Sequence, residues 1–403
     1  MTQTPGQDPA HPPASPGAPA AGRACPHCGA ALDPAARFCE GCGQAVTAGA
    51  AAPGSSAAAQ AAIASTATGP TVAGEASPGD DLGHSPISAP THLTPVAPAP
   101  PAGRRPCTAC GGQVGPDLYC EQCGTKAPTE RDHFREEPAG WVAGVCDRGI
   151  AHHRNEDAMA LAATPVPGER AVLVVLDGVS SSIDSDVASL AGARAAREVL
   201  RQRLPQGMGT PESRAAAVAK AFGDTVVAAN EAVVAATAPD SPNPASATFV
   251  AAVLEGRRLA FANVGDSRAY WLPDPGQPGE PVQLTVDDSG AQAQIEAGVP
   301  REQAETSTHA HAITKWLGRD SPDLTPRVGE LELSGSGWVL VCSDGLWNYA
   351  SEPTAIAEVV VREQEAGATD PAALALALVR FANDCGGRDN ITATLARVDA
   401  PVA

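Results

Sequence analysis

Carboxylates recur in this chain at the ends of short apolar runs. Asp177 directly follows the run AVLVVL, Asp344 lies two residues after WVLVC, and Asp389 lies just before ITATLARV. If these runs are strands, each carboxylate lies at a strand end, where an ionised side chain is costly unless it is paired or bound to a cation. A single such aspartate is best explained as a turn or cap residue. The inference therefore depends on the repetition.

Three further acidic residues fit the same pattern. Asp266 lies in the turn VGDSR between two apolar runs, and Glu156 and Asp157 lie in RNEDA, after another run. Carboxylates that converge repel one another, and a hard divalent cation such as Mg²⁺ or Mn²⁺ neutralises them through oxygen ligands. A site with two such ions can generate hydroxide near neutral pH and hold a phosphoryl group for in-line displacement. The pattern thus predicts a metal-dependent phosphoryl-transfer site.

Cysteines in the N-terminal part form two sets of four. Each set consists of two CxxCG turns, CPHCG with CEGCG and then CTACG with CEQCG. Two such turns can bring four thiolates around one Zn²⁺, and units this short need the metal in order to fold. A redox function is less favoured, because the βαβ pattern of thioredoxin-like proteins is lacking. We expect two structural zinc ions, one held by Cys25, Cys28, Cys39 and Cys42, the other by Cys107, Cys110, Cys120 and Cys123.

Apolar runs bounded by turn residues predict the strands that must position these carboxylates. The expected strands are 141–146, 171–176, 248–254, 259–264, 269–272, 338–342 and 391–398. Helices are expected over 184–203, with Asp184 or Ser185 as N-cap, over 211–236 and over 371–383. Because several strands are consecutive and the helices come in blocks, mainly antiparallel sheets with helices on their outer faces are predicted.

The composition predicts several parts along the chain. Pro-, Ala- and Gly-rich stretches indicate disorder and linkers. The predicted order is a disordered segment 1–20, zinc ribbon 1 at 21–47, an Ala/Pro-rich linker at 48–103, zinc ribbon 2 at 104–126, a linker at 127–138 and a catalytic domain at 139–399.

The formal net charge of −19 over 403 residues excludes some classes of partner. An acidic surface repels nucleic-acid phosphate and anionic lipid. The sequence contains no apolar run of the roughly 18 residues that a membrane helix needs, and its N-terminus lacks the features of a secretory signal. We therefore expect a cytoplasmic protein without nucleic-acid or membrane partners, in which paired cysteines bind metal.

The order of the motifs resembles the metal-dependent protein phosphatase family (PPM, or type 2C). The resemblance covers nearly all of residues 141–398 and is most specific in GDSRAY, CSDGLWN and RDNIT, with further matches in VVLDGVSSS, LTVDDSGAQAQIEAG and AITKWLG. It implies an α+β fold, a four-layer αββα sandwich of two antiparallel sheets flanked by helices. It also implies hydrolysis of phosphoserine and phosphothreonine in proteins by a metal-activated water.

The resemblance assigns roles to the core aspartates. Asp177 would bridge the two central Mg or Mn ions, with the carbonyl of Gly178 as a further ligand, and Asp344 and Asp389 would complete one of them.

Other positions follow from the same resemblance. Glu156 or Asp157 would serve the second ion, directly or through water, and Asp266 would hold a third, weaker ion. The implied partners are phosphoprotein substrates of a Ser/Thr kinase system, and the zinc ribbons could contact a protein partner.

The sequence departs from the family in the first motif. His152 stands where the family usually has an arginine that binds the substrate phosphate, and Arg154 lies two residues later, on the same side of an extended chain. We hypothesise that Arg154, aided by His152, replaces the missing arginine. A surface ion pair is the equally weighted alternative for Arg154. Asp288 also replaces a frequent histidine.

These departures leave a second function open. The chain could be a catalytically weak or inactive phosphatase-fold module that acts as a regulatory binding protein. Retention of all the core aspartates favours the enzyme. A DNA-binding zinc protein is a third possibility, which the acidic charge opposes.

Overall fold

A computed structural model describes residues 23–24, 31–32, 112–115, 118–124 and 127–400. Strands β1 (Arg23–Ala24) and β2 (Ala31–Leu32) pair with each other in an antiparallel manner. They belong to a unit, residues 1–79, that is separate from the rest of the chain. The remaining elements belong to the second unit.

One sheet of the second unit has six strands in the order β11-β10-β14-β15-β4-β3, and every neighbouring pair is antiparallel. Its strands are β3 (His133–Ala139), β4 (Val142–Asp147), β10 (Arg268–Pro273), β11 (Val282–Gln283), β14 (Gly337–Cys342) and β15 (Ile391–Val398).

The other large sheet has five strands in the order β13-β9-β8-β6-β5, again antiparallel throughout. Its strands are β5 (Ala158–Ala163), β6 (Arg170–Leu176), β8 (Phe249–Glu255), β9 (Arg258–Val264) and β13 (Arg327–Glu332). Two short strands, β7 (Ser246–Ala247) and β12 (Leu317–Gly318), form a separate pair.

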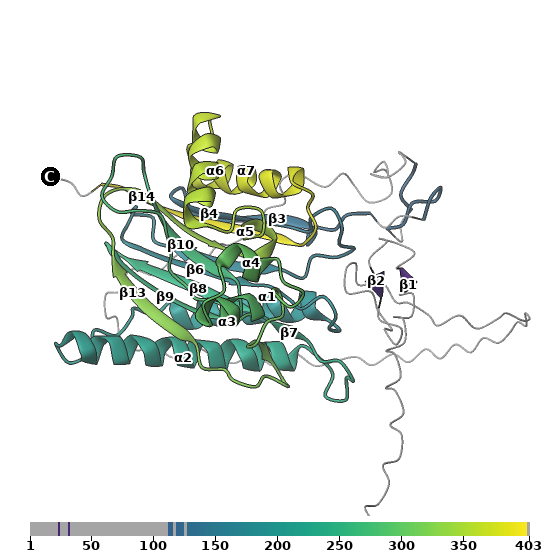
Figure 1. The fold of residues 1–403 in the computed structure, drawn as a ribbon, viewed down its shortest axis with the longest axis horizontal. Coiled ribbons are helices and arrows are strands. Elements are labelled where there is room, and N and C mark those ends of the chain that lie inside the picture. The colour runs from purple at the N-terminus through teal and green to yellow at the C-terminus, as the bar shows by residue number, and fades with distance from the viewer. Residues whose placement is uncertain (1–22, 25–30, 33–111, 116–117, 125–126, 401–403) are drawn as a thin grey trace, which may run out of the picture. The chain divides into compact units, whose positions relative to one another are not determined.

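Helices cover the outer face of each sheet (Figure 1). Helices α1 (Ser185–Leu200) and α2 (Pro211–Ala235) pack on the five-stranded sheet, and α6 (Pro353–Glu365) and α7 (Pro371–Asp384) pack on the six-stranded sheet. A third apolar cluster fills the space between the two sheets. The predicted four-layer αββα sandwich of two antiparallel sheets is therefore confirmed for this part of the chain.

The central strands are buried on both faces, which explains their unbroken apolar sequences. Every residue of β6 and of β14 is buried. Alternate residues of β6 enter different clusters: Val172 and Val174 face α1 and α2, while Leu173 and Val175 face the other sheet. A strand covered on one face alone would alternate apolar and polar residues. Burial in the middle of four layers removes that alternation.

Three short helices complete the end of the sandwich that carries the acidic residues. They are α3 (Gly290–Glu296), α4 (Arg301–Glu305) and α5 (Asp344–Trp347). Asp344 is itself the first residue of α5, so the strand β14 and the helix α5 fix it from both sides.

The seven predicted strands and three predicted helices are all present, with shifts of a few residues at their ends. One boundary is wrong: β3 lies largely within 127–138, which the sequence predicts to be a linker. Phe134 of β3 is 2% exposed, and β3 pairs with β4 from His133 opposite Asp147 onward. The charged sequence HFREEPA suits an edge strand and has little apolar periodicity, which is why it reads as a linker.

The start of α1 also differs from expectation. Asp184 occupies the N-cap position, but its φ is 60° and, among the residues described, its side chain makes no capping hydrogen bond. The Ser185 hydroxyl donates to Glu156 Oε1 at 3.2 Å, so the first residue of the helix contacts an acidic residue of the predicted site.

No helix among the described residues combines the length and apolar character needed to cross a bilayer.

Candidate active site

The fold brings the predicted carboxylates to one end of the two sheets. Asp177 follows β6, Asp266 lies between β9 and β10, Asp344 follows β14 and Asp389 precedes β15. Burial first, and then repulsion from Asp157, Asp344, Asp389 and Asp266, raises the pKa of Asp177 well above its ordinary value. Residues more than 200 positions apart in the sequence therefore share one electrostatic environment, as predicted.

Asp157 is fully buried and is held by two hydroxyl groups. Its Oδ2 accepts hydrogen bonds from Ser343 Oγ at 2.6 Å and from Thr392 Oγ1 at 2.7 Å. Burial raises its pKa to about 6, against the opposing effect of these hydrogen bonds. Ser343 directly precedes Asp344 and Thr392 follows Asp389 by three residues, so these two hydroxyls connect three of the acidic segments.

The pKa of Glu156 is shifted in the opposite direction, below its usual value. Burial raises its pKa, but hydrogen bonds from His152, Arg154 and Ser180 outweigh burial and lower the pKa below the usual value. Its backbone N–H donates to Asn390 Oδ1 at 2.7 Å, next to Asp389. Glu156 is thus held ionised and fixed against the loop that carries Asp389.

The pKa values of Asp266 and Asp389 are raised, as is that of Asp177. Burial and the charge of Asp344 raise the pKa of Asp266 well above its ordinary value. Burial and Asp344 likewise raise the pKa of Asp389 to about 7, although His152 opposes the shift. Burial and mutual repulsion therefore disfavour the ionised forms of these three carboxyl groups.

Two glycines allow the acidic segments to approach one another. A Cβ atom on Gly178 would lie 2.7 Å from the carbonyl oxygen of Glu156, and one on Gly149 would lie 2.1 Å from that of Asp389. Gly149 also has a φ of 73°, which a larger residue adopts with strain. The carbonyl of Gly178, predicted as a metal ligand, thus lies in a segment packed directly against Glu156.

His152 and Arg154 both contact acidic residues. His152 lies between Glu156 and Asp389, with Nδ1 3.5 Å from Glu156 Oε2 and Nε2 3.2 Å from Asp389 Oδ1. Arg154 Nε donates to Glu156 Oε1 at 2.9 Å, and its Nη2 donates to Ser182 O at 2.9 Å and to Ser185 Oγ at 3.2 Å. These contacts favour a role for Arg154 in positioning Glu156 rather than in contacting phosphate.

The oxygen atoms of the acidic cluster bear on its fit to a divalent metal. As they stand, no three His, Cys, Asp or Glu side chains within the described part of the chain form a ready ligand set. However, Asp157 Oδ1 and Asp344 Oδ1 are buried and accept no hydrogen bond from any residue that the structure describes. Buried carboxylate oxygens without a donor are costly, and hard oxygen-binding cations are the partners that relieve this cost. The donor set therefore fits Mg²⁺ or Mn²⁺.

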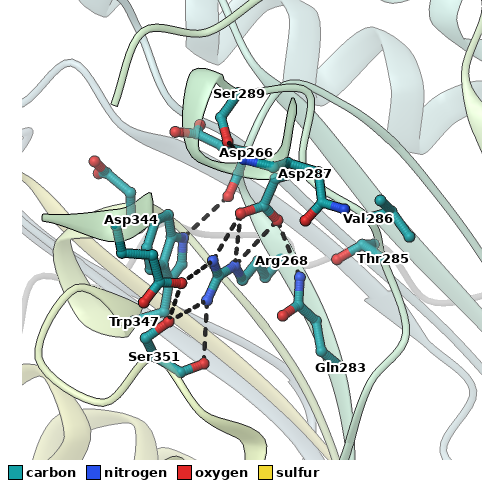
Figure 2. Close-up of polar contacts among 12 residues, drawn as sticks. Asp266, Arg268, Gln283, Thr285, Val286, Asp287, Ser289, Asp344, Trp347 and Ser351 are labelled. Carbon is teal, nitrogen blue, oxygen red and sulfur yellow. Dashed lines mark hydrogen bonds and ion pairs between the residues drawn. The ribbon is translucent and has the colours of Figure 1, made fainter. Parts of the chain in front are cut away.

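A buried arginine connects Asp266 to the α3–α4 segment (Figure 2). Arg268 Nε and Nη2 contact the carboxylate of Asp287, and its guanidinium stacks on Trp347 at 3.5 Å from the ring centre. Trp347 Nε1 donates to the backbone oxygen of Asp266 at 3.0 Å. Glu305 of α4 contacts Arg268 at 3.5 Å. The carboxylate pattern of the sequence does not indicate Arg268, although this residue lies inside the specific motif GDSRAY.

Asp288, which replaces a frequent histidine of the family, has defined partners. Its Oδ1 accepts from Arg327 Nε of β13 at 3.0 Å, and its Oδ2 accepts from the backbone N–H of Gly265 at 3.2 Å. The substitution therefore joins the turn that carries Asp266 to an edge strand. Ser343, Thr392 and Asn390 were also missed, because single hydroxyl and amide residues in or next to strands carry no distinctive signal in one sequence.

The predicted zinc ligands lie mostly outside the described residues. The residues outside are Cys25, Cys28, Cys39, Cys42, Cys107 and Cys110, whereas Cys120 and Cys123 are described. Cys120 is buried, and its backbone forms an isolated antiparallel β-bridge with Val114. The backbone N–H of Gln122 donates to Cys120 Sγ at 3.4 Å.

The sequence and the fold both match known proteins. The family described as Protein phosphatase 2C matches residues 150–378, which is more than half of the chain. The chain belongs to this family.

The relatives named below are serine/threonine phosphatases. PstP of Mycobacterium tuberculosis is 29% identical over 264 residues, which are 64% of this chain and 44% of PstP. The phosphatase stp of Listeria monocytogenes is 27% identical over 256 residues, 63% of this chain and 94% of that protein. The solved structure of the S. agalactiae serine/threonine phosphatase has a TM-score of 0.52 and 22% identity, and the match covers 64% of this chain and 99% of that one. The last comparison supports the fold.

Proposed function

We propose that this chain is a metal-dependent protein phosphatase that hydrolyses phosphoserine and phosphothreonine in proteins. The observation that carries the proposal is the convergence of Asp177, Asp266, Asp344 and Asp389 at one end of the sandwich, where each is buried or lies against the others and the pKa of Asp177 is raised by all of them. The family membership and the phosphatase relatives support the same reaction. The chain spans less than half of PstP, so its substrates are part of the proposal.

Some residues of the site would bind the metal ions, and others would position those ligands. Asp177, Asp344 and Asp389, the carbonyl of Gly178, and Glu156 or Asp157 would hold two Mg or Mn ions, and Asp266 would hold a third. When bound, the ions neutralise the cluster and supply an activated water for attack on phosphorus. His152 contacts Glu156 and Asp389, and Arg154 fixes Glu156. Ser343 and Thr392 orient Asp157.

The test is Mn²⁺-dependent hydrolysis of p-nitrophenyl phosphate and of a phosphothreonine peptide by the full chain. Asp344→Asn should lower kcat by a factor of at least about 100, because it removes a ligand charge that stabilises the transition state. Asp384→Asn is the matched control, since Asp384 is an exposed aspartate at the end of α7, and it should leave the rate unchanged. A wild-type chain that binds the phosphopeptide but does not hydrolyse it would favour the alternative, a regulatory binding protein.

We also propose that each set of four cysteines binds one Zn²⁺ and that the resulting modules contact a protein partner. Burial of Cys120 and the N–H···S contact from Gln122 support this, because backbone N–H groups stabilise a thiolate. Elemental analysis of the purified chain should give two zinc ions per molecule. Replacing Cys120 and Cys123 by serine should reduce the content to one, and unchanged zinc content would contradict the assignment. A cytoplasmic location and a partner Ser/Thr kinase system remain predictions from the sequence.

A further inference from the structure

A pocket of about 390 Å³ opens beside the acidic cluster. Asp389 and Arg388 line it together with Gly345, Trp347 and Asn348 of the α5 region and with Glu302 of α4. Asn348 Nδ2 donates to Asp344 Oδ2 at 3.1 Å, so one wall of the pocket contacts Asp344 directly. The side chain of Asp389 is 39% exposed, so a carboxylate of the cluster is accessible to a molecule from solvent.

Arg388 is a cation in this pocket, and no residue that the structure describes pairs with its charge. Its backbone N–H donates to Tyr349 Oη at 3.0 Å, which fixes the start of its side chain. Within the described residues, its guanidinium makes no ion pair and no hydrogen bond. The other arginines near the cluster differ: Arg154 is bound by Glu156 and Arg268 by Asp287.

The lack of a partner is informative because acidic residues are close by. Asp389 is adjacent to Arg388 in sequence, yet its Oδ1 contacts His152 Nε2 at 3.2 Å instead. A guanidinium can bind a carboxylate or a phosphate through two parallel N–H donors, and none of the neighbouring carboxylates that the structure describes occupies those donors of Arg388. Arg388 remains available, on the wall of a pocket that reaches the cluster.

A phosphate monoester carries up to two negative charges and must approach a cluster of carboxylates. A guanidinium at the rim lowers the cost of that approach and offers two parallel N–H donors to phosphate oxygens. We propose that Arg388 binds the phosphate group of the substrate at this pocket. The inference rests on the proposed phosphatase function, because that function makes a phosphate ester the substrate. The inference assigns to Arg388 the contact with the substrate phosphate that the sequence predicts for Arg154.

The test compares Arg388→Ala and Arg388→Lys with the wild-type full chain in saturating Mn²⁺. Two quantities are measured: the KM for p-nitrophenyl phosphate, and the Kd for inorganic phosphate by calorimetry. Loss of a charge-assisted hydrogen bond should raise both by about tenfold or more in Arg388→Ala, with a smaller change in kcat. Arg388→Lys should restore part of the affinity. Arg380→Ala, at an exposed arginine of α7 outside the pocket, is the matched control and should change neither quantity.

The outcomes separate this inference from the proposed function. If the wild-type chain hydrolyses the ester and Arg388→Ala has the wild-type KM and Kd, the inference is overturned and the phosphatase function stands. If the wild-type chain binds phosphate through Arg388 without hydrolysing the ester, the inference stands and the proposed function is contradicted. A wild-type chain that neither binds phosphate nor hydrolyses the ester contradicts both.

Discussion

Arg268 and Asp287 form a buried bidentate ion pair, with Nε 3.0 Å and Nη2 2.7 Å from the carboxylate oxygens. Both side chains are at most 5% exposed. The pair lies beside Trp347, whose indole N–H is bonded to the backbone of Asp266. One ion pair therefore supports both the turn that carries Asp266 and the segment that leads into α3.

Asp287→Ala should lower the free energy of unfolding by about 3 kcal/mol, because it removes the bidentate partner of the buried guanidinium of Arg268 and leaves the more distant Glu305, at 3.5 Å, as its counter-ion. Urea denaturation measures this loss. The exposed pair Lys220–Asp224 serves as a control, since its side chains are 75% and 60% exposed. Asp224→Ala should cost less than about 1 kcal/mol. Equal losses of unfolding free energy in Asp287→Ala and Asp224→Ala would show that the buried guanidinium of Arg268 does not need Asp287 as a counter-ion.

Sequence patterns predicted the central strands because burial on two faces leaves a strong apolar signal. The edge strands were harder to predict. Strand β13 has the sequence RVGELE with no fully buried residue, and β5 has the alanine-rich sequence AMALAA, whose intrinsic strand preference is low. Pairing with β9 and β6 makes them strands. Tertiary context of this kind cannot be inferred from local composition.

The acidic site, like the fold, was predicted only in part from the sequence. The aspartates were found because ionised side chains next to buried strands are unusual, and their convergence follows from the sheet order. The residues that orient them were not found. Ser343 and Thr392 contact Asp157 from 186 and 235 positions away in the sequence, and nothing in a local pattern records such a contact. Arg388 was passed over because its significance lies in the absence of a partner, which only the structure can show.

Replacing Asp177 by asparagine should have opposite effects with and without metal. In a chelator, Asp177→Asn should unfold at a higher temperature than the wild type, with a gain of at least about 1 kcal/mol, because a repelled and partly buried charge is removed. Mn²⁺ should raise the melting temperature of the wild type and have little effect on the variant. Asp274→Asn is the contrasting control: Asp274 is bound by Arg397, so its loss should destabilise the chain while the response to Mn²⁺ is retained. Lower stability of Asp177→Asn in chelator would contradict the charge repulsion.

Truncation should show whether β3 is needed by the catalytic domain, which the sequence predicts to begin at residue 139. A chain that begins at residue 127 keeps β3, whereas one that begins at 139 loses it together with the buried side chain of Phe134. The shorter chain should lose at least about 3 kcal/mol of unfolding free energy through that side chain alone. It also exposes the edge of β4, which invites aggregation. Thermal denaturation followed by circular dichroism measures the difference, and equal midpoints would show that β3 is dispensable.

Glu136 should make the stability of the protein depend on pH. Its Oε2 accepts from the backbone N–H of Leu161 at 2.7 Å, so a residue of β3 in one sheet binds the outer edge of β5 in the other. Burial raises its pKa from 4.5 to about 7, against the hydrogen bond from Leu161 and the charges of two arginines of α1. The folded state therefore holds the proton more tightly, and this group lowers the free energy of unfolding as pH rises from about 4.5 to about 7.

Glu136→Gln stays neutral, so its stability relative to the wild type should improve by up to about 3 kcal/mol between pH 4.5 and pH 8. Urea denaturation at both pH values measures the change. Glu137→Gln, at the exposed neighbouring residue, should show no comparable change. A pH-independent difference for Glu136→Gln would mean that the pKa of Glu136 is the same in the folded and unfolded states, which would contradict the shift.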